Sequence, residues 1–284
     1  MKKLSRTKIL LTLSISIIAL LFTAAPVKTA VSNQKAKSAL KVRAKKRYKA
    51  AFDLAHNEIF SPLVEGPLHY SKFYKMIKKS GASMAVNKKA LTPGSLSEFD
   101  AYVVAGPSKD FSPGELTELR EFVNDGGSLL VLLHISGPVA RLTEQFGIVV
   151  SNFVISEHLN TIKNKSQDFH VRDFSPHPVT RGLKEIAVFG TWGLMTEKGG
   201  AVVAKTSEKA WADLNRNRDF DKDEPEQSFG IIGVSEYGEG KVVVVADDAP
   251  FANLFIGMAD NSKLARNIVR WFMERRKTGG INAR

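Results

Sequence analysis

The stretch that decides the expected fold reads Gly126-Gly127-Ser128-Leu129-Leu130-Val131-Leu132-Leu133-His134-Ile135-Ser136-Gly137-Pro138. Its five consecutive aliphatic residues, Leu129 to Leu133, stand between a glycine pair and a Gly-Pro step. A short, wholly apolar run of this kind is typical of a strand that is buried on both faces, as in the middle of a parallel sheet. We therefore expect a central strand here. His134 and Ser136 would then lie at its carboxyl end, where open α/β sheets bind their ligands.

Strand and helix patterns alternate on both sides of this run. The clearest helix start is Ser112-Pro113-Gly114-Glu115, which places Ser at the N-cap, Pro in the first turn and Glu at the third position of a capping box. The alternation predicts an α/β fold with a doubly wound, mostly parallel sheet, a three-layer sandwich of the flavodoxin type, and a C-terminal antiparallel hairpin. We expect strands at 48–54, 83–86, 101–105, 148–150, 186–189, 201–205, 229–235 and 241–246, and further helices at 68–80, 138–146 and 260–275.

Residues 1–30 have the pattern of an export signal. A basic start precedes the apolar run Ile9 to Ala25, which is too short for a comfortable membrane span and typical of a signal-peptide core. The segment is expected either to be cleaved as a signal peptide or to stay as an N-terminal anchor. We therefore expect an exported protein, whether periplasmic, extracellular or membrane-anchored and facing outside. An uncleaved span would instead favour retention inside, because the residues after it are strongly basic.

The net charge of +12 is concentrated near the N-terminus. Residues 1–49 hold 13 Lys and Arg and no Asp or Glu, so 28 of the 41 basic residues remain to balance all 29 acidic ones. This near-neutral body argues against nucleic-acid binding, which needs a basic face. Residues 31–47 form a basic linker that is either a solvated spacer or a helix on an anionic membrane, touching it through residues 31–49. Without cysteine there is neither a disulfide nor a lipidated cysteine.

The body is expected to be one domain, residues 48–275, followed by a tail at 276–284. The alternation of strands and helices breaks down after the central strand and its helix, so we treat residues 151–228 as an insertion. Part of it, residues 172–182, is rich in turn-forming residues.

Several motifs follow one another in an order that resembles the class I glutamine amidotransferase-like superfamily. Within it the chain is most similar to an uncharacterised exported branch related to gliding-motility transport accessory proteins and intraflagellar-transport-type domains. The resemblance implies an amidotransferase-like, Rossmann-like fold over about residues 48–275, and ligand or partner binding more than catalysis. Amidotransferases use a nucleophilic cysteine, which this chain lacks, so we expect no glutamine amidotransferase activity. The motifs lie at 52–57, 111–115, 124–132, 177–182, 238–247 and 260–268.

Residues 213–224 have the ligand spacing of an EF-hand calcium loop. Oxygen-bearing side chains stand at positions 1, 3, 5, 7, 9 and 12, and such hard ligands suit Ca²⁺. Position 6, normally glycine, is Arg218, and no helix pair obviously flanks the loop. The segment is therefore either a calcium site that orders the insertion or a solvated acidic loop. The ligands would be Asp213, Asn215, Asn217, Asp219, Asp221 and Glu224.

Polar side chains also follow three of the expected strands. If the first and central strands flank the point where the strand order reverses, these side chains would share one crevice. An Asp/His/Glu cluster there would hold a metal or carry out acid–base chemistry, because imidazole titrates near neutrality. Alternatively, the aspartates cap nearby backbone and the first histidine fills a polar loop. The residues are Asp53, His56 and Glu58 after the first strand, His134 and Ser136 after the central strand, and Asp247 and Asp248 after the last.

Ser136 lacks the surroundings of a hydrolase nucleophile. A Gly-x-Ser-x-Gly elbow needs glycine two residues before the serine, but that residue is His134. We therefore expect a non-catalytic, extracytoplasmic binding or accessory module whose partner is a small molecule, a glycan or a protein. The alternative is a metal- or acid/base-assisted hydrolase that uses Asp53, His56, Glu58 and Asp247. Convergence of these four side chains within metal-ligand or hydrogen-bond distance would favour the enzyme.

Overall fold

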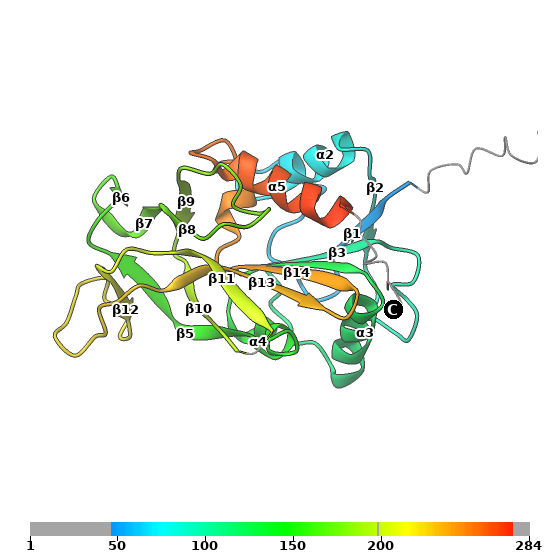
Figure 1. Ribbon diagram of the computed structural model, residues 1–284, viewed down its shortest axis with the longest axis horizontal. Coiled ribbons are helices and arrows are strands. Elements are labelled where there is room, and N and C mark those ends of the chain that lie inside the picture. The colour runs from blue at the N-terminus through cyan, green and yellow to red at the C-terminus, as the bar shows by residue number, and fades with distance from the viewer. Residues whose placement is uncertain (1–46, 198, 275–284) are drawn as a thin grey trace, which may run out of the picture. The chain divides into compact units, whose positions relative to one another are not determined.

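The computed structural model describes residues 47–197 and 199–274 (Figure 1). The predicted signal segment 1–30, nearly all of the basic linker 31–47 and the tail 276–284 lie outside the described residues. Within the described ranges there are 14 strands, four α-helices and one short 3₁₀ helix. None of those helices combines the length and the hydropathy that a membrane span requires.

Five parallel strands form one half of the main sheet, in the order β14-β4-β3-β1-β2. The predicted central strand is confirmed, because β4 lies between β3 and β14 and all five of its residues are buried. Burial on both faces explains why these strands read as continuous apolar runs. Their bounds are β1 (Lys49–Asp53), β2 (Ser83–Asn87), β3 (Ala101–Ala105), β4 (Ser128–Leu132) and β14 (Gly240–Val245).

Helices cover both faces of this half (Figure 1). One core lies under α2 (Ser71–Lys79) and α5 (Asn261–Met273), and a second lies under α3 (Pro113–Asn124) and α4 (Gly137–Glu144). The predicted capping box is confirmed: the Ser112 hydroxyl accepts from the Glu115 N–H, and the Glu115 carboxylate accepts from the Ser112 N–H. These caps fix the start of α3 next to the loop that follows β1.

The other half of the main sheet is antiparallel. β13 pairs with β14 as the predicted hairpin, and β10, β5 and β12 continue the sheet outward, while β11 pairs with β13 and β8. A second sheet of three strands has the order β6-β7-β9. The remaining elements are β5 (Ile148–Glu157), β6 (Thr161–Ile162), β7 (Lys165–Val171), β8 (Asp173–Phe174), β9 (Ile186–Phe189), β10 (Trp192–Thr196), β11 (Gly200–Lys205), β12 (Ala210–Asp213), β13 (Gly230–Tyr237) and the 3₁₀ helix η1 (Ala249–Phe251).

The predicted fold class, a doubly wound and mostly parallel sheet, is wrong. The main sheet has 11 strands and is mixed, with four parallel pairings and six antiparallel ones. The reason lies in the connections between β5 and β14, which contain no helix among the described residues. A parallel pairing needs a crossover of about a dozen residues or more, usually a helix. Without crossover helices, the chain from β5 to β13 adds strands that pair antiparallel in the main sheet instead of β-α-β units.

Candidate functional site

The first candidate site lies where the strand order of the parallel half reverses. β2 lies on one side of β1, and the next strand, β3, lies on the other side, so the switch point falls between β1 and β3. The loops after these two strands are tied together there: Ile59 donates its N–H to the Gly106 carbonyl, and Ser108 donates to the His56 carbonyl. Open sheets bind ligands at this position, outside the carboxyl ends of the strands.

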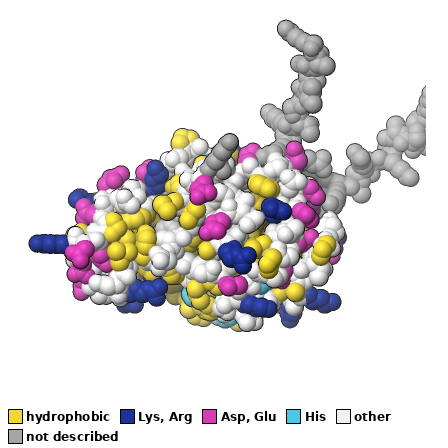
Figure 2. All heavy atoms as spheres, turned by 90° about the horizontal axis from the view of Figure 1, so that it is seen from below, with side chains coloured by type: hydrophobic (Ala, Val, Ile, Leu, Met, Phe, Trp, Pro, Cys, Tyr) yellow, Lys and Arg dark blue, Asp and Glu magenta, His cyan; other side chains and the backbone are white. Residues whose placement is uncertain are grey.

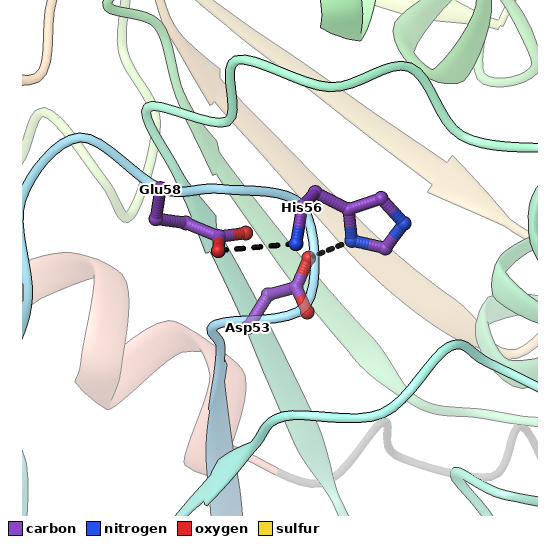
Figure 3. A group of neighbouring side chains, drawn as sticks. All are labelled: Asp53, His56 and Glu58. Carbon is purple, nitrogen blue, oxygen red and sulfur yellow. Dashed lines mark hydrogen bonds and ion pairs between the residues drawn. The ribbon is translucent and has the colours of Figure 1, made fainter.

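Asp53, His56 and Glu58 meet at this point, and we call them the β1 cluster (Figure 3). One ligand atom from each lies within 4.8 Å of the other two. Asp53 is the last residue of β1, and the other two belong to the turn that follows, in which Asn57 adopts a positive φ of 52°. This left-handed residue reverses the chain, and the Glu58 carboxylate then accepts the His56 N–H at 3.2 Å.

The His56 ring lies between two carboxylates. Nδ1 is 2.5 Å from Asp53 Oδ2, Nε2 is 3.1 Å from Glu115 Oε1, and the ring stacks on Phe111 at 3.8 Å. Burial alone would lower the pKa of His56, but the Asp53 hydrogen bond and the neighbouring negative charges raise it above its ordinary value. Two carboxylate partners require both ring nitrogens to donate, so the geometry selects the imidazolium.

Asp53 and Glu115 are held by further hydrogen bonds. Asp53 Oδ1 accepts from the Tyr102 hydroxyl at 2.8 Å and from the Ala55 N–H at 3.2 Å. Glu115 carries out its capping role through Oε2, while Oε1 accepts from the Leu91 N–H as well as facing His56. Although burial opposes it, these donors hold the pKa of Glu115 below its ordinary range. Both carboxylates are therefore fixed in position, and that of Glu115 is favoured in the ionised state.

Glu58 differs from its neighbours. Its Oε1 atom is buried and has no hydrogen-bond partner, and its carboxyl group faces that of Asp53. Burial, together with the charge of Asp53, raises the pKa of Glu58 to about 8. Two neighbouring carboxylates repel one another unless a proton or a cation lies between them, so this position favours a positively charged or protonated occupant.

The residues after β4 and β14 form a separate group. His134 Nδ1 lies 3.3 Å from Asp248 Oδ1, and the Tyr70 hydroxyl donates to Asp248 Oδ2 at 2.5 Å. The hydrogen bond to Asp248 raises the pKa of His134, and burial beside Asp248 raises that of Tyr70. The His134 side chain is 38% exposed, whereas that of Asp248 is 6% exposed. Ser136 is buried and makes no capping hydrogen bond to α4.

Three of the four residues of the predicted crevice therefore converge, and the fourth caps backbone. Asp247 accepts from the Phe189 N–H at 2.6 Å through one oxygen and from the Ala249 N–H at 2.9 Å through the other. Burial and the charge of Asp248 raise its pKa well above the ordinary value. Asp247 thus serves the backbone role that the sequence left open as an alternative, while Asp53 both caps Ala55 and contacts His56.

The second candidate site is the loop 213–224, which follows β12. Asp213 Oδ2 accepts from the Arg218 N–H at 3.1 Å, and Glu224 accepts from the Leu214 N–H at 2.8 Å and from the Asp221 N–H at 3.2 Å. Arg218 has a φ of 69°, the left-handed conformation that glycine usually supplies at position 6. The arginine therefore does not prevent the sharp turn.

The side chains of the loop point toward one another. The Asn215 and Asn217 amides both donate to Asp221 Oδ2, at 2.8 and 2.9 Å, and Asp219 donates its N–H to Asn217 Oδ1. Asp213 is fully buried, and its Oδ1 atom has no hydrogen-bond partner. Hydrogen bonds between side chains thus join three of the six predicted residues, Asn215, Asn217 and Asp221, and one buried oxygen of Asp213 is left unsatisfied.

Sequence reasoning missed the residues that surround the β1 cluster. Glu115 was assigned to a helix cap alone, and neither Tyr102 nor Tyr70 was singled out. A cue existed for Glu115, because the first turn of a helix that follows a parallel strand lies at the carboxyl edge of the sheet. No local pattern marks the two tyrosines, which reach the site from within β3 and from the residue before α2.

The face drawn in Figure 2 carries charges of both signs among the described residues. On the face shown in Figure 2, Lys and Arg side chains are interspersed with Asp and Glu. This agrees with the balanced charge of the sequence after residue 49. Long-range attraction of a strongly charged partner to this face is therefore not expected.

Comparison with known protein families gives one match. A family model described as "Domain of unknown function (DUF4350)" matches residues 65–269. No curated protein matches the chain. The resemblance to the class I glutamine amidotransferase-like superfamily is therefore wrong, and so is the Rossmann-like assignment. The quoted motifs mark strand ends, turns and helix starts, which many unrelated open sheets share.

Solved structures resemble the chain in fold. The mmIFT52 N-terminal domain is 18% identical with a TM-score of 0.64, over 80% of this chain and 98% of that one. Cytoplasmic Protein STM1381 from Salmonella typhimurium LT2 is 12% identical with a TM-score of 0.54, over 80% and 100%. Cytoplasmic Protein STM3548 from Salmonella typhimurium is 14% identical with a TM-score of 0.51, over 79% and 98%. At these identities the likeness concerns the fold alone.

Proposed function

The chain belongs to the DUF4350 family, and we propose that it is a non-catalytic, exported binding module stabilised by one Ca²⁺ in the loop 213–224. The observation that carries the proposal is the buried Oδ1 atom of Asp213, which has no partner in the protein. Burying an unpaired carboxylate oxygen is costly, on the order of 1–3 kcal/mol or more. A cation among the loop oxygens would remove this cost.

The donor set fits calcium. Carboxylates, amide oxygens and backbone carbonyls at these spacings are the ligands of an EF-hand-type loop, and an aspartate at position 1 with a glutamate at position 12 are its anchors. Asp213 and Glu224 occupy these two positions, and both are buried. Calcium sites of extracellular modules bind with dissociation constants of about 10⁻⁴–10⁻³ M. Even a weak site would thus fill outside the cell, in agreement with the expected export signal.

The loop is connected to the outer end of the sheet. Phe220, at position 8, packs edge-on against Trp211 of β12 at 5.8 Å and against His158 at 5.2 Å. Trp211 pairs with Ser156 of β5, so β12 is the edge strand that the loop leaves. Calcium in the loop would hold Phe220 on this aromatic group. Its role would be to order the β5–β12 end of the sheet.

Thermal unfolding of the full chain tests the proposal. Calcium at about 100 times its dissociation constant should stabilise the wild type by about 2.7 kcal/mol relative to chelator. Asp213→Asn should abolish this difference, because it removes an anchor ligand with little change of volume. Asp223→Asn is the matched control: it removes the same charge from position 11, which is not a ligand position. A wild-type melting curve that ignores calcium and chelator would refute the proposal.

Tryptophan fluorescence gives a local readout. The chain has three tryptophans, so Trp192→Phe with Trp271→Phe leaves Trp211 as the reporter beside Phe220. Calcium should then change the emission of Trp211 with one-site saturation, and Asp213→Asn should remove the change. If calcium raises the melting temperature but leaves the emission of Trp211 unchanged, the ion binds elsewhere in the protein.

A hydrolase is the second candidate, favoured by the pair His134–Asp248. A half-exposed imidazole oriented by a buried carboxylate is an arrangement used by general bases. Against this, Asp247 caps backbone and the His56 ring is paired on both sides. Hydrolysis of activated esters that is lost in His134→Gln and kept in His158→Gln would favour the enzyme over the binding module.

A further inference from the structure

The β1 cluster has the spacing of a metal centre. The three ligand atoms lie within 4.8 Å of one another. Two ligands at about 2.1 Å from an ion can be at most about 4.2 Å apart. Side-chain shifts of less than about 1 Å would therefore bring all three to coordinating distance. The cluster also lies at the switch point between β1 and β3, where this kind of sheet places ligands.

The surroundings of His56 are those of a metal-binding histidine. Such residues almost always donate their second ring N–H to a carboxylate or carbonyl, which fixes the ring. Nδ1 of His56 faces Asp53, while Nε2 faces Glu115 Oε1 at 3.1 Å. Asp53 is supported in the same way: Tyr102 and Ala55 hold its Oδ1 atom and leave Oδ2 toward His56. The outer partners of two ligands are thus already in place.

Hydrogen bonds within the protein do not satisfy the carboxyl group of Glu58. Its Oε2 atom accepts the His56 N–H, but its buried Oε1 atom has no donor, and a ligand oxygen of the group lies within 4.8 Å of Asp53 and His56. Either a proton or a metal ion has to lie between the carboxyl groups of Asp53 and Glu58. Figure 3 shows the Glu58 carboxyl group directed toward Asp53 and His56.

We propose that Asp53, His56 and Glu58 bind one divalent first-row transition-metal ion. One imidazole nitrogen and two carboxylates form a mixed set that suits Zn²⁺, Mn²⁺ or Fe²⁺, whereas Ca²⁺ prefers oxygen ligands alone. Glu115 and Tyr102 act as positioning residues, since they hold the ligands and do not reach the ion. The inference is independent of the calcium loop, which shares no residue with the cluster.

Zn²⁺ titration of the full chain, stripped with chelator and then held in excess Ca²⁺, tests the proposal. The calcium keeps the loop 213–224 saturated, so failure of one site is distinguishable from failure of the other. One Zn²⁺ should bind per chain.

Glu58→Gln, which keeps the volume of the side chain, should weaken binding at least tenfold. Glu115→Gln should weaken it about 10–100-fold, the usual effect of losing an outer partner of a metal ligand. His134→Gln removes a half-exposed imidazole at the same edge of the sheet and should leave Zn²⁺ binding unchanged.

Paramagnetic Mn²⁺ gives a readout on the wild type that does not depend on any variant folding. Mn²⁺ at one equivalent should broaden the ring resonances of His56 and leave those of His158, near the calcium loop, sharp. The proposal is overturned if the wild type binds no Zn²⁺, if binding survives Glu58→Gln and Glu115→Gln, or if His134→Gln removes it. It is equally overturned if Mn²⁺ leaves His56 unbroadened, which would mean that a proton alone links Asp53 and Glu58.

Discussion

The β1 cluster and the loop 213–224 are both acidic, but they are built in opposite ways: the cluster is largely buried, whereas the loop is exposed between its two buried ends, Asp213 and Glu224. The six oxygen-bearing residues of the loop come from twelve consecutive positions, and most of their hydrogen bonds stay within the loop. The cluster depends on Glu115 and Tyr102, which are 59 and 49 residues away from their partners. A local site is specified by spacing, whereas a tertiary site is specified by the topology that brings its parts together.

The two regions also balance their negative charge differently. His56 supplies an internal cation to Asp53 and Glu115. In the loop, two amide donors reach Asp221, but Asp213 Oδ1 has no partner. In the absence of a bound metal ion, the cluster should therefore hold its shape through its own imidazolium, whereas the loop should depend on an added ion. Changes that remove the internal cation or the external one will test this difference.

The largest expected effect is that of His56→Ala. Removing the ring leaves Asp53 and Glu115 buried without a counter-charge and opens a cavity beside Phe111. Breaking a buried ion pair by removing one partner typically costs about 3–5 kcal/mol. We expect a loss in this range in urea unfolding at pH 7, measured in chelator so that no metal contributes. His158→Ala is the control, since that ring is half-exposed; equal losses in both variants would contradict an internal role for His56.

The loop 213–224 should behave in the opposite way. In chelator, Asp213→Asn should change the unfolding free energy by less than about 1 kcal/mol, because the amide oxygen can still accept the Arg218 N–H while the amide nitrogen takes the place of the oxygen that has no partner. In saturating calcium the variant should have an unfolding free energy about 2–3 kcal/mol below that of the wild type, because it lacks the whole of the stabilisation that bound calcium provides. Paired melts with and without calcium measure both values. A large loss in chelator would show that the loop, like the cluster, is held together by internal contacts.

The sequence predicts the parallel half of the fold because each strand there is a separate apolar run. Leu129 to Leu133 marked β4, and Ser112 with Glu115 marked the start of α3. The error in fold class came from residues 148–213. Strand β5 continues to Glu157 through polar residues, and β7 has the sequence KSQDFHV, so neither shows a clean apolar pattern. Antiparallel strands with one solvated face give a weaker signal than strands buried on both faces.

For the candidate sites, all six residues proposed for the loop 213–224 follow from local spacing, whereas only part of the surroundings of the β1 cluster can be predicted from the sequence. Asp53, His56 and Glu58 lie within six residues, so a turn after β1 was enough to suggest them. Whether Asp247 joins them depends on where β9 lies, since Phe189 is the residue whose N–H it caps. That contact spans 58 residues and depends on the position of the second sheet, which the sequence did not predict.

A smaller effect separates the two roles of Glu115. Ser112→Ala removes the cap of α3 and should cost about 1 kcal/mol. Glu115→Gln keeps part of the cap but exchanges the charge that faces His56 for a neutral amide, and we expect a further loss of about 1–2 kcal/mol. The double variant should be non-additive, because both changes act on one hydrogen-bonded group. Strict additivity in a double-mutant cycle by urea unfolding would show that the cap and the His56 contact are independent.

The smallest expected effect is on the pH dependence of stability and concerns His134, whose ring is half-exposed. The pKa of His134 is raised by Asp248, so the charged ring binds its proton more tightly in the folded state. Its stabilising contribution is therefore complete below the unfolded pKa of about 6.5 and is lost as the pH rises through the higher folded value. Solvent screening of a ring that is 38% exposed limits the contribution to about 0.5 kcal/mol.

The wild type and His134→Gln should therefore differ most at pH 6 and converge by pH 9. Glu58, with a pKa of about 8, titrates in both proteins, so taking the difference between the two unfolding curves removes its influence. Asp247 and His134 shift each other's pKa, so the contribution of Asp247 stays part of the measured difference. The gap should also shrink in 1 M salt, where the Debye length falls to about 3 Å. A gap that stays constant across pH would mean that His134 stabilises the fold through its edge-on contact with Phe60 at 5.2 Å and not through its charge.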